Sequence, residues 1–190
     1  MFSRTDRLLL RPGWLEDAPA LQAAIADPAV IRNLASAPWP YGPEDAQAFL
    51  SAPRDPKLPD FLAFSRTRGA PRLIGGCGIQ RDADGRLVLG YWIARPFWGL
   101  GFATEASAAV MRIARATGLG RVSASHFIDN PSSGRVLRKV GFHPTGRIEK
   151  EYSRGRADHV LAAQFEDSGV MPMRADLSAS LYMDRPPIAA

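Results

Sequence analysis

Two glycines separated by one residue give the clearest sign of chemistry in this sequence. Gly99 and Gly101 lie in the segment WGLGFA at residues 98–103, where a strand-like apolar run gives way to a helical pattern. Glycines at such a turn allow a tight backbone and bring N–H groups close to a ligand. With the positive end of the helix dipole, these amides suit a phosphate or pyrophosphate. The spacing alone is as typical of a plain turn as of an anion site.

Two common nucleotide-binding motifs do not match this turn. The sequence contains no G-x-x-x-x-G-K-[ST], so a P-loop is unsupported. A dinucleotide-binding fold requires a longer glycine fingerprint early in a repeated βαβ pattern, and that pattern is missing as well. Both readings are therefore excluded as poor fits.

The chain resembles the GNAT acyltransferases, specifically the RimJ/RimL-like N-acetyltransferases. GYWI at 90–93 followed by WGLGFATEA at 98–106 is similar to the acyl-CoA motif of that family. A second match, NPSS at 130–133 followed by LRKVGF at 137–142, is similar to its N-x-x-S and K-x-G-F segments. The resemblance extends from Thr5 to about Gln164. It departs at Pro96, where many GNAT proteins carry a basic or amide residue.

The resemblance implies transfer of an acetyl group from acetyl-CoA to a primary amine by direct attack in a ternary complex, with coenzyme A as product. It implies that backbone donors near Tyr91 polarise the thioester carbonyl. It also implies a catalytic pair, Ser133 and Asn130, with Ser133 protonating the departing thiolate. The cofactor-binding residues that it assigns are Trp92, Ile93, Trp98, Gly99, Leu100, Gly101, Phe102, Ala103, Thr104, Asn130 and Arg138.

These assignments have structural alternatives. Asn130 before a proline is typical of a helix N-cap, and Ser133 could simply satisfy free amides in the first helical turn. Arg138 could be an ordinary exposed helix residue. The general base stays open, because the strand predicted at 86–93 contains no carboxylate. The candidates are Glu149, Glu151, Asp158 and His126, each with a solvated or structural role as its alternative.

The acceptor pocket is expected between an aromatic loop, a strand and a turn. We expect its walls to be Trp39 and Tyr41, then Tyr91 with Trp92, and the turn at 153–156. The two loop aromatics could equally hold their loop against the core. Aromatic walls with few acidic groups predict an acceptor with at most one positive charge. A protein or peptide N-terminus and an amino-acid-like small molecule both meet that description.

The elements that position these residues follow from periodicity. Residues 87–93 are β-branched and aromatic, as in a strand, and the apolar residues from Ala106 to Ala114 form one helical stripe. The resemblance adds an α/β (α+β mixed sheet) architecture of about seven strands, with helices on both faces and a splayed central strand pair. The other predicted strands are 7–11, 61–66, 73–80, 121–128, 145–152 and 159–165, and the other predicted helices are 16–26, 29–34 and those beginning at Pro43 and Asn130.

Length and composition indicate one domain. The 190 residues are 46% hydrophobic and 23% charged, which is typical of a globular protein. We expect a GNAT domain at 1–166 and a loosely docked tail at 167–190. No apolar run approaches the roughly 20 residues of a membrane helix, and the start lacks a signal-peptide pattern, so a cytoplasmic bacterial protein without a membrane partner is expected. Cys77 is the single cysteine and the histidines show no metal-ligand spacing, so no disulfide and no metal are expected.

The net charge of +5 favours anionic partners, but the basic residues are scattered. A polyanionic cofactor explains this charge as well as nucleic acid would, and no nucleic-acid partner is expected. Two other function classes stay open: a non-catalytic acyl-CoA-binding regulatory module and, more weakly, a nucleic-acid-binding protein. A homodimer is also left open.

Overall fold

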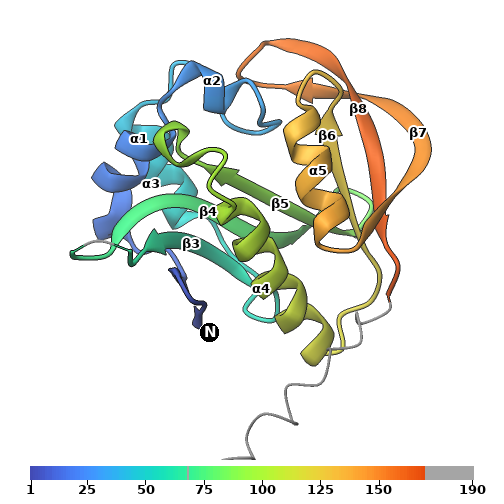
Figure 1. Cartoon of the computed structure of the whole chain (residues 1–190). Helices are drawn as coiled ribbons and strands as arrows, with labels where there is room; N and C mark the ends of the chain where they lie inside the picture. The colour runs from blue at the N-terminus through green and yellow to red at the C-terminus, as the bar shows by residue number, and fades with distance from the viewer. Residues whose placement is uncertain (68, 170–190) are drawn as a thin grey trace, which may run out of the picture.

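One eight-stranded sheet with helices on both faces forms the fold (Figure 1). The computed structural model describes residues 1–67 and 69–169. The strands stand in the order β1-β2-β3-β4-β5-β6-β8-β7. They are β1 (Ser3–Arg4), β2 (Leu8–Arg11), β3 (Asp60–Ser65), β4 (Arg72–Arg81), β5 (Leu87–Ile93), β6 (Val122–Phe127), β7 (Phe142–Ser153) and β8 (Asp158–Asp167). The helices are α1 (Ala18–Ile25), α2 (Pro28–Ile31), α3 (Pro43–Ser51), α4 (Phe102–Ala116) and α5 (Pro131–Lys139), with 3-10 turns at Leu15–Asp17 and Arg95–Phe97.

Side chains that alternate along the strands divide between two cores. In β5, Leu89 and Ile93 pack with the buried side chains of α4. Trp92 points to the other side of the sheet, where it packs against the core built from α1, α2 and α3. Figure 1 shows α4 crossing the near side of the sheet with α5 beside it. We call the two sides the α4 face and the α1 face.

The sheet opens at its centre, between β5 and β6. These parallel strands pair only at Leu87 with Val122 and at Val88 with Ser123. Beyond these pairs they separate, while β5 stays paired with β4 as far as Ile93. The opening beyond Val88 is called the gap below.

Backbone groups of β5 face the gap. The carbonyl of Leu87 accepts a hydrogen bond from Ser123 Oγ of β6 at 3.2 Å, so this residue directs its backbone groups toward β6. Because backbone groups alternate sides along a strand, those of Leu89 and Tyr91 point the same way. Within the described residues they have no strand partner there, and a ligand with amide groups could pair with them.

The predicted fold class is confirmed, with one more strand than expected. The extra strand, β1, has two residues and pairs antiparallel with β2. Two residues carry no periodicity, so the sequence pattern could not indicate this strand. The helix predicted at 16–26 is also divided, because a 3-10 turn precedes α1.

The last strand, β8, ends at Asp167, one residue beyond the predicted domain at 1–166. Asp167, the final residue of β8, accepts a hydrogen bond from Arg115 of α4 at 2.8 Å, and both side chains are largely buried. This ion pair fastens the end of the sheet to α4. Most of the predicted tail at 167–190 lies outside the described residues.

Candidate active site

The glycine turn adopts backbone angles that suit glycine. Gly99 and Gly101 have φ of 76° and 83°, in the left-handed region, and Gly101 is the N-cap of α4. In the described structure, no side chain caps this helix end, so its first amides remain available to an anion. Phe102 is buried in the core beneath the turn, whereas Leu100 is 54% exposed. The turn is anchored on one side and open to a ligand on the other.

Glu105 fastens this turn to the N-terminal strands. Its Oε1 accepts hydrogen bonds from Thr5 Oγ1 at 2.6 Å and from Arg7 N at 2.9 Å, and its Oε2 accepts one from Arg7 Nε at 2.7 Å. Arg7 also donates to the carbonyl of Leu100 at 2.9 Å. Burial acts to raise the pKa of Glu105, but these hydrogen bonds and the charge of Arg7 hold that pKa below its ordinary value. The carboxylate is therefore committed to holding the turn.

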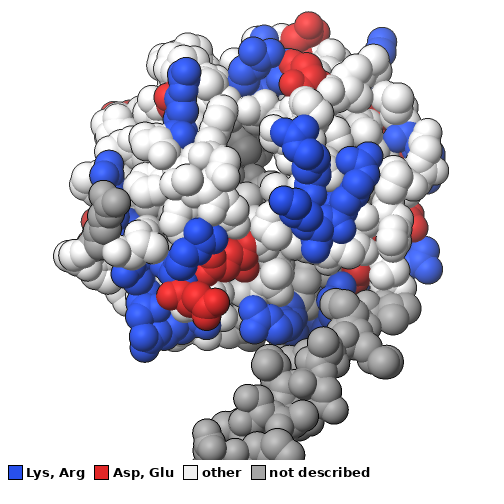
Figure 2. All heavy atoms as spheres, viewed as in Figure 1, with Lys and Arg blue, Asp and Glu red and all other residues white. Residues whose placement is uncertain are grey.

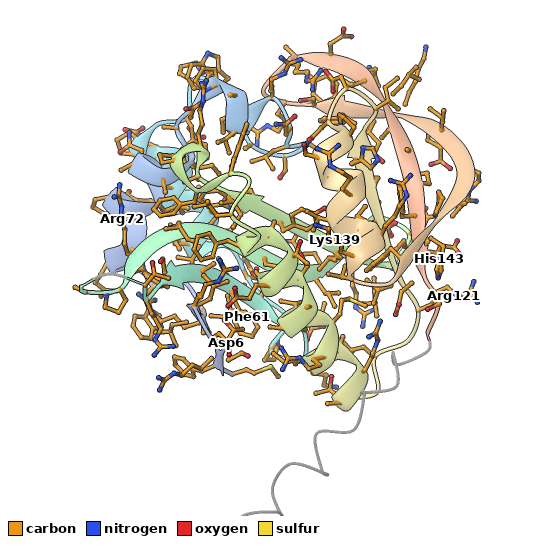
Figure 3. The ribbon with its side chains drawn as sticks, viewed as in Figure 1. Asp6, Phe61, Arg72, Arg121, Lys139 and His143 are labelled. Atoms are coloured by element: carbon orange, nitrogen blue, oxygen red, sulfur yellow. The ribbon has the colours of Figure 1, made fainter. Side chains whose placement is uncertain are left out.

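Basic side chains gather on α5, across the gap from the turn. Arg135, Arg138 and Lys139 belong to this helix. Figure 2 shows blue side chains over α5 beside a hollow in this face, and Figure 3 marks Lys139. The Arg138 guanidinium also stands over the ring of Phe165, at 5.4 Å from its centroid. Helix α5 thus supplies positive charge near the gap, whereas Pro96, at the position where many GNAT proteins carry a basic or amide residue, supplies none.

A cavity of about 600 Å³ adjoins the gap and lies mainly on the α1 face. This volume falls within the range of small-molecule sites. Strands β4, β5 and β6, helix α3 and the loop at 33–38 surround it. The lining residues with polar or aromatic side chains that enter the argument below are Tyr41, Asp45, Asp60, Tyr91, Trp92, Ser125, His126, Ser133, Glu151 and Arg154.

Ser133 meets Tyr91 beside the gap. Their hydroxyl oxygens are 2.7 Å apart, and the Tyr91 hydroxyl is also 3.0 Å from the carbonyl oxygen of Ser133. Burial raises the pKa of Tyr91, although the hydrogen bond with Ser133 acts against this rise. Tyr91 therefore stays protonated near neutral pH. The pair places two linked hydroxyl groups next to the backbone that faces the gap.

The start of α5 explains which residue caps this helix. Asn130 Oδ1 accepts a hydrogen bond from the backbone N–H of Ser133 at 3.4 Å, and Pro131 occupies the first helical position. The predicted N-cap role of Asn130 is confirmed. The Ser133 side chain bonds to Tyr91 and, among the described residues, to no helix amide.

Glu151 is the carboxylate among the four proposed bases that lines the cavity. It is held from both sides: Ser125 Oγ donates to its Oε2 at 3.0 Å, and Gln164 Nε2 donates to its Oε1 at 2.8 Å. The alternation in β6 puts Ser125 on the α1 face, because the neighbouring Ala124 packs in the core beside α4. Glu151 therefore lies on the α1 face, beside the gap.

The other three candidates are placed less favourably. His126 lines the cavity, but its Nδ1 lies 2.8 Å from the Phe127 carbonyl and its Nε2 faces α5, where a Cβ on Gly134 would come within 2.5 Å. Glu149 and Asp158 are exposed and are not among the lining residues. The sequence could not separate these roles: Glu149 and Glu151 lie two residues apart and share a face of β7, so only the pairing of β7 with distant strands decides which of them reaches the cavity.

The aromatic residues proposed for the acceptor pocket are only partly brought together. Tyr41, Tyr91 and Trp92 line the cavity, but Trp39 does not and is 46% exposed. Burial, together with the charge of Asp45, raises the pKa of Tyr41 to about 12. The side chain of Trp92 is on the α1 face, and its backbone groups point toward β4 rather than toward the gap.

Two other predicted cofactor residues support the turn from within. The indole Nε1 of Trp98 donates to the carbonyl of Ile93 at 2.6 Å, which joins the end of β5 to the glycine turn. The Ile93 side chain is buried beside α4. Both residues therefore shape the turn. The remaining predicted positions, Ala103 and Thr104, lie in the first turn of α4.

The turn between β7 and β8 lies at one side of the cavity, and Arg154 is the residue of 153–156 that lines it. The backbone N–H of Arg154 donates to the carbonyl of Ala35 at 2.8 Å. Ser153 Oγ donates to the Leu34 carbonyl at 3.1 Å. Arg156 Nε donates to the Arg32 carbonyl at 2.6 Å. These bonds hold the turn against the loop that forms the other wall.

The prediction that the acceptor pocket has few acidic side chains is wrong for the cavity as a whole. Three carboxylate residues line it, Asp45, Asp60 and Glu151, against one arginine, Arg154. The sequence did not indicate Asp45 and Asp60 as pocket residues, because Asp45 lies in the first turn of the helix predicted from Pro43 and Asp60 directly precedes the strand predicted at 61–66. The expected limit of one positive charge on the acceptor therefore loses its basis.

The described residues give no sign of a metal centre or a membrane segment. Between residues 1 and 169, leaving out 68, no group of three or more His, Cys, Asp and Glu side chains is placed to hold a metal ion. Within the same residues, no helix combines the length and the apolar character needed to cross a membrane.

Comparisons with known proteins agree with this geometry. A family model described as an acetyltransferase (GNAT) domain matches residues 7–143. The chain is 32% identical over 159 residues to the uncharacterized N-acetyltransferase YoaA of Bacillus subtilis. This match covers 77% of this chain and 85% of YoaA.

Solved structures show the same fold. The GNAT-family acetyltransferase from Bacillus anthracis superposes with a TM-score of 0.73 at 22% identity, covering 87% of this chain and 97% of that protein. RimL, a ribosomal L7/L12 α-N-protein acetyltransferase in complex with coenzyme A, superposes with a TM-score of 0.69 at 18% identity, covering 87% and 97%. The open amides of the glycine turn, the gap and the cations of α5 also fit acetyl-CoA. With a family match over most of its length, the chain belongs to the GNAT family of acetyl-CoA-dependent acetyltransferases.

Proposed function

We propose that this chain is a RimJ/RimL-like N-acetyltransferase whose acceptor is a primary amine, either a protein or peptide N-terminus or an amino-acid-like small molecule. One observation carries the proposal: a single cavity at the gap is lined by the Ser133–Tyr91 hydroxyl pair and by Glu151. Tyr91 alternates with Trp92 and so lies on the α4 face, whereas Glu151 lies on the α1 face. Direct acetyl transfer requires an acid for the leaving thiolate and a base for the entering amine, on opposite sides of the carbonyl.

The donor side is built from the α4 face. Acetyl-CoA supplies an activated acetyl thioester. The amides of the glycine turn and the α5 cations hold its phosphates. The backbone N–H of Tyr91 faces the gap and polarises the thioester carbonyl, in the manner of an oxyanion hole.

Ser133 delivers the proton that the departing thiolate requires. Its hydroxyl donates toward the gap while Tyr91 donates to Ser133 Oγ, across the 2.7 Å that separates the two oxygens. Since burial raises the pKa of Tyr91, its proton is present throughout the neutral range. The relay therefore starts from two protonated hydroxyls and ends with a neutral thiol and a Tyr91 phenolate, which takes a proton from solvent before the next turnover.

Glu151 receives the proton that the amine loses. Ser125 and Gln164 hold its carboxylate in one orientation, so little reorganisation is needed when an amine enters from the α1 face. An amine must be neutral to attack, and a carboxylate within direct or water-mediated reach supplies the base.

The test is a free-thiol assay with acetyl-CoA over a panel of peptides, amino acids, diamines, polyamines and aminoglycosides. We expect acceptor-dependent release of coenzyme A with at least one primary amine. Micromolar binding of acetyl-CoA without thiol release on any amine would overturn the proposal. It would leave the non-catalytic acyl-CoA-binding module.

Replacing Gly101 by Val should weaken acetyl-CoA binding without unfolding the protein. A branched side chain strains the backbone at φ 83° and obstructs the helix end. A loss equal to one or two charge-assisted hydrogen bonds corresponds to about 10-fold or more in Kd. Calorimetry measures the change.

Gly85→Val is the matched control for this substitution. Gly85 has φ 79° in the turn between β4 and β5, and a Cβ there meets no atom within 4 Å. It therefore carries the same backbone strain without the loss of affinity. Unchanged affinity in a folded Gly101→Val variant would contradict the placement of the pyrophosphate.

A further inference from the structure

Asp60 is a carboxylate in the cavity that the mechanism above does not use. It opens β3 and lines the cavity. Arg54 Nη1 lies 2.8 Å from its Oδ2, with the two side chains 22% and 18% exposed, and Arg54 itself is outside the lining residues. Among the described residues, no donor makes a hydrogen bond to Asp60 Oδ1. Asp60 therefore forms an ion pair with Arg54 through Oδ2, while its Oδ1 has no donor among the described residues.

Asp60 Oδ1 lies beside a glycine of β4, beyond which a glycine of β5 follows. Asp60 pairs with Gly78 of β4, and Gly78 pairs with Gly90 of β5, so the three residues form one row across the sheet. A Cβ on Gly78 would lie 2.6 Å from Asp60 Oδ1, whereas a Cβ on Gly90 would meet nothing within 4 Å. Since Gly78 and Gly90 have no side chains, neither residue projects a side chain into the space between the Asp60 carboxylate and the gap.

The other two carboxylates of the cavity already have roles. Asp45 accepts a hydrogen bond from the Gly42 N–H at 2.8 Å, at the start of α3. Glu151 accepts one hydrogen bond on each oxygen and serves the reacting amine. Asp60 stands on the opposite side of the gap from Glu151, since it lies on β3, with β4 between it and β5, whereas Glu151 lies on β7, beyond β6 and β8.

Asp60 is partly buried, and a partly desolvated carboxylate oxygen that no protein donor reaches favours a ligand that brings a donor. Burial raises the pKa of Asp60, and the positive charge of Arg54 acts against that rise. An ammonium on the acceptor would supply the missing donor in a charge-assisted hydrogen bond. The lining charges also favour a cation, because three carboxylates face one arginine.

We infer that Asp60 binds a second, positively charged nitrogen of the acceptor and thereby selects diamine-like substrates. The inference rests on the proposed N-acetyltransferase function. Strands are about 4.8 Å apart, and Asp60 Oδ1 leans over β4, so the second nitrogen lies roughly 5–8 Å from the nitrogen that is acetylated. A lysine-like molecule or an N-terminus followed by a basic side chain has this geometry.

The test compares amines of equal length that differ only in the second charge. The pairs are 1,5-diaminopentane against 1-aminopentane and lysine amide against norleucine amide, each with saturating acetyl-CoA. For the wild type we expect kcat/KM to be about 10-fold or more higher for the doubly charged member, the value of one hydrogen bond to a charged group. In Asp60→Asn we expect this ratio to fall to near one while turnover of the singly charged member is retained.

Controls separate this role from loss of the fold. Asp84→Asn removes a carboxylate from the exposed turn between β4 and β5 and should leave the ratio unchanged. If Asp60→Asn is unstable because Arg54 is left unpaired, the double variant Arg54→Met/Asp60→Asn removes both charges and gives the same readout.

Two results overturn the inference in different ways. Equal turnover of both members by the wild type, or an unchanged ratio in a folded Asp60 variant, refutes the role of Asp60 and leaves the N-acetyltransferase function standing. No turnover of any amine by wild-type protein that binds acetyl-CoA refutes the proposed function, and the role of Asp60 with it.

Discussion

Replacing Glu151 by Gln should lower kcat/KM for amine acceptors by about 10²- to 10⁴-fold, the usual contribution of a general base. Glutamine keeps the shape of the side chain and an oxygen for the Ser125 hydrogen bond, but it cannot take a proton. Affinity for acetyl-CoA should change little, because Glu151 lies on the α1 face. Steady-state kinetics with calorimetry for acetyl-CoA gives both quantities.

Glu149→Gln is the control for this substitution. It removes the same charge two residues earlier on the same strand, from an exposed side chain outside the cavity. The Glu151→Gln variant should also recover as pH rises toward the pKa of the amine, since more acceptor is then neutral without help. Equal losses in both variants, or no recovery with pH, would show that Glu151 is not the base.

Replacing Ser133 by Ala should slow the chemical step by about 10- to 10⁴-fold with nearly unchanged affinity for acetyl-CoA. The substitution removes the hydroxyl that lies 2.7 Å from the Tyr91 hydroxyl and breaks the proton relay. Single-turnover release of coenzyme A isolates this step from binding and product release.

The helix should survive this change, because Asn130 rather than Ser133 supplies its side-chain cap. Ser132→Ala is the matched control: it removes a neighbouring hydroxyl that accepts a hydrogen bond from Arg135, on the exposed side of α5. If Ser133 had a structural role alone, Ser133→Ala would lose about 1 kcal/mol of stability with turnover near normal. A melting curve beside the kinetics distinguishes the two results.

Both acid and base depend on one feature, the parting of β5 from β6 after two residue pairs. The parting exposes the backbone of β5 to the donor and opens a route between the two faces of the sheet. In the proposed mechanism, the Ser133–Tyr91 pair and Glu151 work on the same carbonyl from opposite sides. Asp60 lies farther along the α1 face, where it is proposed to contact the distal part of an acceptor.

Local features of this protein could be predicted from its sequence because they depend on neighbouring residues. The glycine turn, the amphipathic α4 and the Asn130-Pro131 helix start each need only a few consecutive side chains and their backbone preferences. The strand positions followed from the same short-range patterns, to within a few residues at their ends. The sequence pattern does not indicate β1, because two residues are too few to show the alternation of a strand.

Tertiary structure alone decided which distant side chains share the cavity. Glu151 was one of four candidates until the pairing of β7 with β8 and β6 placed it beside Ser125 and Gln164. Asp60 gave no signal, since its proposed role depends on burial and on the glycines of β4, which lies beside it, and of β5, which is the next strand. Trp39 matched the pattern of a pocket aromatic yet lies outside the lining. A sequence period indicates that a strand has two faces, but only pairing with distant strands and burial determine what each face meets.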